Sequence, residues 1–441
     1  MRPHGPRALR IKYVHLSGAV QLRGSSKETP VRPGFEWILV ATVFLVSAIN
    51  YADRSSITAL FPLLKRDLGF NDVGLGAIGS LFLWSYAFAS PVSGYVGDRF
   101  DRGRIIVWSL AGWSLITLVS GLVAAQWQLL SMRFLLGLVE SMYLPAAMAL
   151  VAQHHPPKTR ATALALMGLG NYAGLMGGGA IGGYLGGLYG WRAPLCVLGL
   201  VGIILAPVCY FILCARDKTA GDVSTAAAEP LSFIDAARRL LGIPSFVILA
   251  IAGVLTSIGA WIFINWLPLY FKESFSMSLA AAGFLGSSLV PIGAAVSQTL
   301  GGPVSDLLAR RGPQYRMLMQ AVLIGCAAPT LLVFVVTHNR TAIIAALILY
   351  SVFRSCGDLN MIPLIFDLAG KDKASTAFGI TNMVNSIAGG LGIFVAGWVK
   401  ADFGLAGVFT AVAGILVFDA LMLFSGYALF VKKDLAASAA A

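Results

Sequence analysis

Two charged residues, Asp53 and Arg54, stand side by side in the first long apolar stretch of the chain, which runs from about Phe35 to Pro62. At the centre of a bilayer each charge costs roughly 2.5–3.5 kcal/mol, whereas each Leu, Ile, Val or Phe gains about 0.3–0.6 kcal/mol. Charges in such a helix normally face a protein interior or a wet cavity and mark the path of an ion or a substrate.

The alternative interpretation is that the pair marks the outer end of this helix, among lipid headgroups. The stretch stays apolar through Leu60 and Phe61, however, and the first turn signal comes at Pro62. With a rise of 1.5 Å per residue, Asp53 then lies about 12 Å inside the outer helix end. We therefore interpret the pair as part of a site.

A second pair of charges, Arg133 and Glu140, lies in a later apolar stretch. Seven residues make two helical turns, so both side chains share one face. Their predicted depths, about 8 Å and about 18 Å below the outer helix end, overlap those of Asp53 and Arg54. Two guanidiniums at similar depth can hold a carboxylate or a phosphate bidentately, and two nearby carboxylates can take up protons.

An anion held by the arginines changes the affinity of neighbouring carboxylates for protons, so binding of an anion and of protons can be coupled. The alternative is that these residues form permanent ion pairs with a structural role, which hold two helices together, as buried pairs often do. Later in the chain Arg354 and Asp358 lie four residues apart. They can extend the site or gate it, but a self-satisfied pair is the interpretation we favour. Asp419 stands alone, with no functional role evident from the sequence.

Other chemistry is limited by where the remaining reactive residues fall. The five histidines lie in tails or loops, so a histidine proton relay inside the membrane is excluded and any proton carrier must be a carboxylate. The five cysteines show no metal-binding or redox spacing. We therefore expect no metal and no cofactor. With no nucleotide-binding loop, nucleophile elbow or soluble domain, we expect the protein not to be an enzyme.

The elements that position these charges are predicted membrane helices. Of the 441 residues, 57% are hydrophobic and 12% charged, about half the charged share of a soluble protein, and the mean hydropathy is +0.79. Apolar stretches long enough to cross a bilayer core of about 30 Å are predicted at twelve places: 36–61, 73–96, 105–125, 128–152, 161–188, 194–214, 244–271, 280–304, 317–337, 341–366, 375–400 and 404–430. The fold class is therefore an all-α polytopic membrane protein.

The net charge of +12 reports topology and not a nucleic-acid partner. Of the 32 Lys and Arg residues, 23 fall in the tails and even-numbered loops, 6 in the opposite loops and 3 inside spans. Basic residues favour the cytoplasmic side, so we expect both termini in the cytoplasm of a multi-pass protein of the cell (inner) membrane.

The chain divides into two related halves. We expect a disordered basic cytoplasmic tail over 1–34, a six-helix bundle over 35–214, a cytoplasmic loop over 215–243, a second six-helix bundle over 244–430 and a cytoplasmic tail over 431–441. The segment after the second span, Gly94-Tyr-Val-Gly-Asp98-Arg99, is echoed after the eighth by Gly302-Pro-Val-Ser-Asp306. A second echo at nearly the same offset links the ends of the fifth and eleventh spans, which indicates a parallel repeat.

These motifs resemble a known superfamily. The segment from Gly94 to Arg104 is similar to the signature loop between the second and third helices of the major facilitator superfamily, and Arg133 with Gly137 resembles a motif of its fourth helix. The resemblance implies the major facilitator fold and transport by rocking of the two bundles. It also implies that residues at the loop motif hold the inner gate shut; here these are Gly94, Asp98, Arg99, Arg102, Asp306 and Arg310.

Within the superfamily, Asn50-Tyr51-x-Asp53-Arg54 and the span around Arg133 resemble the anion:cation symporter family, with spinster-like features in the loop. This resemblance implies that Arg54 and Arg133 contact a substrate anion and that Asp53 and Glu140 carry the coupled protons. Polar and aromatic residues expected to line the cavity include Tyr51, Tyr86, Asn171 and Asn382.

The leading hypothesis is a monomer that carries out proton-coupled symport of a small organic anion such as a sugar acid, with the anion, protons and the lipid bilayer as its partners. Two alternatives stay open: a spinster-like transporter of lysophospholipids, and an organic anion exchanger that does not use protons.

Overall fold

The computed structural model describes residues 34–214, 233–370 and 374–440, and the regular structure within these ranges is entirely α-helical. The first half of the chain contains α1 (Phe35–Ala59), α2 (Phe61–Leu68), α3 (Asp72–Arg99), α4 (Arg102–Ser120), α5 (Gln126–Glu140), α6 (Tyr143–His154), α7 (Pro157–Tyr189) and α8 (Arg192–Leu213). The second half contains α9 (Phe233–Leu241), α10 (Pro244–Phe275), α11 (Leu279–Ala309), α12 (Tyr315–Thr330), α13 (Val333–Val336), α14 (Arg340–Asp358), α15 (Met361–Ala369), α16 (Ala374–Leu429) and α17 (Val431–Ala440).

Twelve membrane crossings follow from these helices. In the described ranges eleven helical segments are long and apolar enough to cross a membrane, and the last of them, Thr376–Leu429, is 54 residues long. Gly404 interrupts it with φ 65° and ψ 175°, a conformation that side chains with a Cβ rarely adopt. The break turns this segment into two antiparallel crossings, so the predicted twelve-helix fold is confirmed.

The fourth and tenth crossings are each broken in the same way. α5 ends at Glu140 and α6 begins at Tyr143, while α14 ends at Asp358 and α15 begins at Met361. A proline follows each break by a few residues, at Pro145 and at Pro363. Proline removes one backbone donor and crowds the preceding turn, so a helix that reaches it kinks or stops. The sequence prediction treated each of these crossings as one continuous helix.

Parts of the segments expected as a loop and a tail are helical. α9 lies within the central segment 215–243, and α17 lies within 431–441. The backbone N–H of Ser245, at the start of α10, donates to Oδ2 of Asp434 on α17 at 2.9 Å, which holds α17 against the second bundle. The expected tail 1–33 and residues 215–232 lie outside the described residues.

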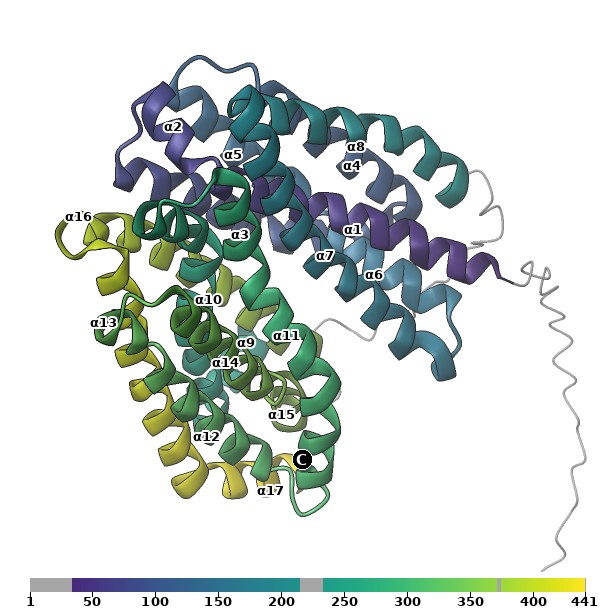
Figure 1. Ribbon diagram of the computed structural model, residues 1–441. Coiled ribbons are helices and arrows are strands. Elements are labelled where there is room, and N and C mark those ends of the chain that lie inside the picture. Colours follow the sequence, from purple (N-terminus) through teal and green to yellow (C-terminus); the bar gives the residue numbers. More distant parts are fainter. Residues whose placement is uncertain (1–33, 215–232, 371–373, 441) are drawn as a thin grey trace, which may run out of the picture.

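The two halves form two helical bundles that diverge toward the chain termini (Figure 1). With twelve crossings both termini lie on one side of the membrane; we call this the proximal side and the opposite one, which holds α2, the distal side. The most extensive described contacts between the bundles join α3 to the first crossing of α16 and α7 to α11, and α1 also contacts α10 and α11.

Close backbone packing builds the first distal contact, between α7 and α11. A Cβ placed on Gly183 would overlap the carbonyl oxygen of Leu279, and one on Gly179 would overlap Ser287. Because lipid supplies no hydrophobic drive between membrane helices, small residues that bring backbones together carry such interfaces. The further contact on this line is a hydrogen bond from Gln298 Nε2 to the Tyr172 hydroxyl at 2.6 Å, halfway along both helices.

The second contact joins α3 to α16. Ser80 Oγ donates to the Gly390 carbonyl at 2.7 Å, and Trp84 Nε1 donates to the Ile387 carbonyl at 3.1 Å. Phe88 and Val92 continue the same face of α3 toward the proximal side and are 67% and 57% exposed. The bundles are therefore closed on the distal side and open on the proximal side.

We predict that Gly183→Val destabilises the protein by about 1–3 kcal/mol, because the new side chain must displace the backbone of α11. Gly177→Val on the same helix is the matched control, since a Cβ there meets nothing within 4 Å. Thermal unfolding of the purified protein in detergent checks this. Equal unfolding temperatures for the two variants would contradict the proposed packing of α7 on α11.

Candidate functional site

The charged residues of the first bundle lie in the last third of α1 (Asp53 and Arg54) and in the second half of α5 (Arg133 and Glu140), beside the end of α4. Arg54 Nη2 lies 2.7 Å from Glu140 Oε2, and its Nε donates to the same oxygen at 2.8 Å. Only 10% of the Arg54 side chain and none of the Glu140 side chain is exposed. The guanidinium also stacks on aromatic rings, with Cζ 4.6 Å from the ring centre of Tyr51 and 5.2 Å from that of Tyr86. Ion pairing and cation–π contact together hold Arg54 in the apolar interior.

Asp53, the neighbour of Arg54, is bound in another way. It is fully buried, and its Oδ2 accepts a hydrogen bond from Thr117 Oγ1 of α4 at 3.2 Å. Its Oδ1 has no partner. Adjacent residues on a helix point about 100° apart, so Asp53 and Arg54 cannot serve the same partner. Asp53 can therefore take up or release a proton without breaking a described ion pair.

Arg133 is the charged residue of the group for which no hydrogen bond or ion pair is described. Its side chain is 2% exposed, and neither Nε nor Nη2 has a hydrogen-bond partner. A buried charged donor without a partner costs more than the 1–3 kcal/mol of a neutral one, and such an exception calls for an explanation. An anion or a water molecule bound beside Arg133 would supply the missing acceptor.

Two neighbouring cavities lie between the bundles. The smaller one, about 20 Å³, is lined by Arg54, Arg133 and Trp261 among others, and has room for about one water molecule. The larger one, about 280 Å³, lies between α7, α10, α11 and α14 and is close to the lower end of the size range of small-molecule sites. Ile264 lines both cavities, so they adjoin each other.

The predicted lining residues divide into two groups. Tyr51 and Tyr86 lie against the Arg54 guanidinium, but, contrary to the prediction, they line neither of the two described cavities. Asn171 and Asn382 line neither of the two described cavities, and Asn382 is exposed. Trp261 and Ile264 were missed, because an apolar residue facing a cavity has the same sequence signature as one packed in a core.

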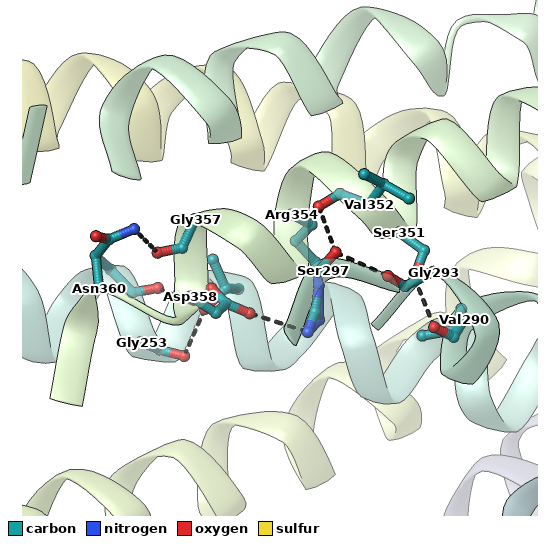
Figure 2. A network of polar contacts seen from close by, with 12 residues as sticks. Gly253, Val290, Gly293, Ser297, Ser351, Val352, Arg354, Gly357, Asp358 and Asn360 are labelled. Carbon is teal, nitrogen blue, oxygen red and sulfur yellow. Dashed lines mark hydrogen bonds and ion pairs between the residues drawn. The ribbon is translucent and has the colours of Figure 1, made fainter. Parts of the chain in front are cut away.

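In the second bundle the predicted pair of Arg354 and Asp358 is formed. Arg354 Nη2 lies 2.9 Å from Asp358 Oδ2, one turn apart on α14, and both side chains line the larger cavity (Figure 2). Arg354 is 13% exposed and Asp358 27%. Asp419, on the last crossing, is fully buried, and neither of its oxygens has a partner.

The predicted gating residues lie at the proximal ends of the helices. Arg99 and Arg102 flank the turn between α3 and α4, while the surroundings of Gly94 and of the Asp98 side chain lie outside what the structure describes. Asp306 Oδ1 accepts from Arg316 Nη2 at 3.0 Å, so its described ion pair is with Arg316 and not with Arg310. Their gating role stays a prediction.

No group of three or more His, Cys, Asp or Glu that could hold a metal ion occurs among the residues that the structure describes. The site therefore consists of arginines, carboxylates and aromatic rings around a cavity between two membrane bundles.

Comparison with known proteins identifies the family of this chain. The sequence pattern of the Major Facilitator Superfamily matches residues 43–393. The chain belongs to this superfamily. It is thus a multi-pass membrane transporter, which confirms the predicted fold and the prediction that it is not an enzyme.

Sugar-acid transporters are among the relatives of this transporter. It is 27% identical over 390 residues to the probable galactarate/D-glucarate transporter GudP of Bacillus subtilis (strain 168), covering 82% of this chain and 84% of that protein. It is 26% identical over 415 residues to the probable galactarate/D-glucarate transporter GarP of Escherichia coli (strain K12), covering 86% and 92%.

A solved structure that resembles the transporter shares its fold. The crystal structure of a bacterial homologue of the human lysosomal transporter Spinster, in an inward-facing and unoccupied conformation, matches with a TM-score of 0.79 at 19% identity, over 91% of this chain and 99% of that one. At this level of identity the likeness concerns the arrangement of the helices and not the substrate.

An ion-pair network that the sequence did not reveal closes the distal side of the transporter. Lys400 Nζ, at the distal end of the eleventh crossing, lies 2.8 Å from Asp72 Oδ1 of the first bundle and 3.0 Å from Glu273 Oε1 of its own bundle. Lys65 Nζ of the first bundle lies 3.0 Å from the same Asp72 oxygen. Lys400 is only 7% exposed, so this contact between the bundles is partly shielded from water.

We predict that Lys400→Met shifts the transporter toward a state open on the distal side. Loss of one partly shielded ion pair is worth about 1 kcal/mol, or roughly a fivefold change in population. The readout is the rate at which an impermeant thiol reagent labels a cysteine placed at Ser287, which is 5% exposed under Gly179, in a background without the five native cysteines.

The matched control is Lys65→Met, which removes a lysine from the same carboxylate but breaks a contact within the first bundle. Labelling should rise about fivefold with Lys400→Met and stay near its original rate with Lys65→Met. A similar rise with both would show that local charge, and not contact between the bundles, controls access.

Proposed function

We propose that this transporter carries a small organic anion of the sugar-acid class across the membrane together with protons. The observation that carries the proposal is the set of Arg54, Arg133, Asp53 and Glu140: two buried guanidiniums and two buried carboxylates at overlapping depths, beside a cavity between the bundles. Arg133 in particular holds nitrogen atoms that lack an acceptor.

The size of the larger cavity and the names of the relatives support the substrate class. About 280 Å³ suits a small molecule. Guanidinium groups bind carboxylates in a fixed bidentate geometry. Relatives that match over more than four fifths of this chain are named as probable galactarate/D-glucarate transporters.

We base the coupling to protons on competition between Glu140 and a substrate carboxylate for the guanidinium of Arg54. In this structure Glu140 occupies both Nε and Nη2 of Arg54, and the space beside the two arginines holds about one water molecule. Protonation of Glu140 removes the negative charge that holds Arg54, which frees the guanidinium for a substrate carboxylate. Proton uptake and anion binding then favour each other.

The closed distal side also indicates how access to the site can alternate between the two sides of the membrane. With the distal ends in contact and the proximal ends apart, substrate reaches the site from the proximal side in this state. Breaking the contacts of Lys400, Gly179 and Gly183 opens the distal side, and an anion bridging the two bundles favours the passage between the two states.

We further propose that the protein lies in the inner membrane as a monomer with both termini in the cytoplasm. The 23 basic residues in the tails and even-numbered loops, against 6 in the opposite loops, support this orientation. The proximal side is then the cytoplasmic side.

We predict that Asp53→Asn and Glu140→Gln each lower the accumulation of D-glucarate driven by a pH gradient in proteoliposomes at least tenfold. Exchange of D-glucarate across the membrane without a gradient should persist, because the arginines remain. Accumulation and exchange of radiolabelled substrate measure the two properties separately. Asp67→Asn, which neutralises an exposed carboxylate paired with Arg66 on α2, is the control and should leave both intact.

Three outcomes would contradict parts of this proposal. If both site variants still accumulate substrate up to the original level, these carboxylates do not couple transport to protons. If the unmodified protein exchanges D-glucarate but never responds to a pH gradient, it is a proton-independent anion exchanger. If lysophospholipids compete for binding and sugar acids do not, the spinster-like alternative replaces the proposal.

A further inference from the structure

We propose that Arg354 on α14 binds a second acidic group of the substrate, so that the transporter selects anions with a carboxylate at each end of a short polar chain. This inference rests on the proposed function and assigns the larger cavity its role. Arg54 and Arg133 of the first bundle bind one carboxylate, and Arg354 of the second bundle binds the other.

The contacts of Arg354 leave room for a ligand. Its Nη2 is bound to Asp358, but its Nε and Nη1 have no partner, nor does Oδ1 of Asp358. A guanidinium has five N–H donors, and a pair that is purely structural normally has its remaining donors satisfied as well. The side chain lines the cavity of about 280 Å³. An arriving carboxylate would meet free donors on a charged group that is largely shielded from water.

The helix that carries Arg354 is held rigidly on both sides of it. Ser351 Oγ donates to the Val290 carbonyl of α11 at 2.6 Å, and Ser297 Oγ of α11 donates to the Val352 carbonyl at 2.8 Å (Figure 2). At the break after Asp358, Asn360 Oδ1 accepts from Ser305 Oγ at 2.6 Å. A binding group mounted on such a fixed backbone needs little reorganisation when its ligand arrives.

The cavity reaches from Arg354 toward the arginines of the first bundle. Ile264 lines both the cavity of Arg354 and the small space beside Arg54 and Arg133. Tyr172 of α7 and Gln298 of α11, which are hydrogen-bonded to each other, stand on its wall where the bundles meet. Arginines thus line both adjoining cavities, and neutral polar groups lie on the wall of the larger one. This arrangement suits an anion with two acidic ends, provided that the substrate carboxylates replace Glu140 and Asp358 as partners of the arginines.

In each half of the chain, an arginine at the cavity is paired with a carboxylate at the end of a helix. Glu140 is the last residue of α5 and Asp358 the last residue of α14, each directly before the break in the corresponding crossing of its half. Each carboxylate binds an arginine at the cavity, Glu140 to Arg54 and Asp358 to Arg354. Asp358 therefore acts as an internal counterion that holds Arg354 until a substrate carboxylate takes its place. The distal Lys400 network lies outside this arrangement.

The test compares D-glucarate with D-gluconate, which share a carbon chain and differ at one end, where a hydroxymethyl group replaces a carboxylate. Equilibrium binding of each is measured by titration calorimetry on the purified full-length protein. The variant is Arg354→Gln/Asp358→Asn, because removal of both charges avoids leaving one buried and unpaired. We expect the original protein to bind D-glucarate roughly 10- to 100-fold tighter, as one charge-assisted contact predicts, and the variant to bind both acids within about threefold.

Two controls make the result specific. Arg340→Gln changes an exposed arginine at the distal start of the same helix and should keep the original preference. Arg54→Gln should weaken both acids alike. If the double variant keeps the original preference, or if the original protein binds D-gluconate as tightly as D-glucarate, Arg354 does not bind a second carboxylate, while the proposed function stands. If the original protein binds neither acid, the proposed function itself fails.

Discussion

The ion pair between Arg54 and Glu140 is the interaction on which the site depends. Neither side chain can remain charged in an apolar helix bundle without the other, since an uncompensated buried charge costs several kcal/mol. The pair therefore joins the last third of α1 to the end of α5. Beside it, Asp53 accepts a hydrogen bond from Thr117, and Nε and Nη2 of Arg133 have no partner.

The contact between the two bundles at α7 and α11, in contrast, does not depend on a buried ion pair. Where Gly179 and Gly183 meet α11, the contact is made by backbone atoms and small groups, with no long side chains to interlock. Such surfaces gain from van der Waals contact when closed and lose little else when separated. The described polar contacts across the interface are a few individual ones, namely the Lys400–Asp72 ion pair and the hydrogen bonds of Ser80, Trp84 and Gln298. Because these contacts can be broken without unfolding either bundle, each bundle can move as a unit.

Much of the site could be predicted because depth along a helix is simple arithmetic. Asp53, Arg54, Arg133 and Glu140 were predicted at overlapping depths, and the structure pairs Arg54 with Glu140 and places Arg54 and Arg133 at one small cavity. Which acid pairs with Arg54 could not be predicted, because pairing depends on how α1 and α5 are rotated about their axes. The exposure of Asn382 could not be predicted either, because it depends on how α16 is rotated about its axis. The breaks after Glu140 and Asp358 could have been read from Pro145 and Pro363.

Lys400 is shared between Asp72 and Glu273. This sharing affects the free-energy difference between the state closed on the distal side and the state open on that side. When the distal ends separate, Lys400 keeps Glu273 on its own bundle, and Asp72 keeps Lys65 on the other. Lys400 then pairs with one carboxylate instead of two, and each of these charged groups keeps a partner of opposite charge in both states. Separation of the distal ends therefore costs less free energy than it would if Lys400 and Asp72 were each other's sole partners, because no partly buried charge is left uncompensated.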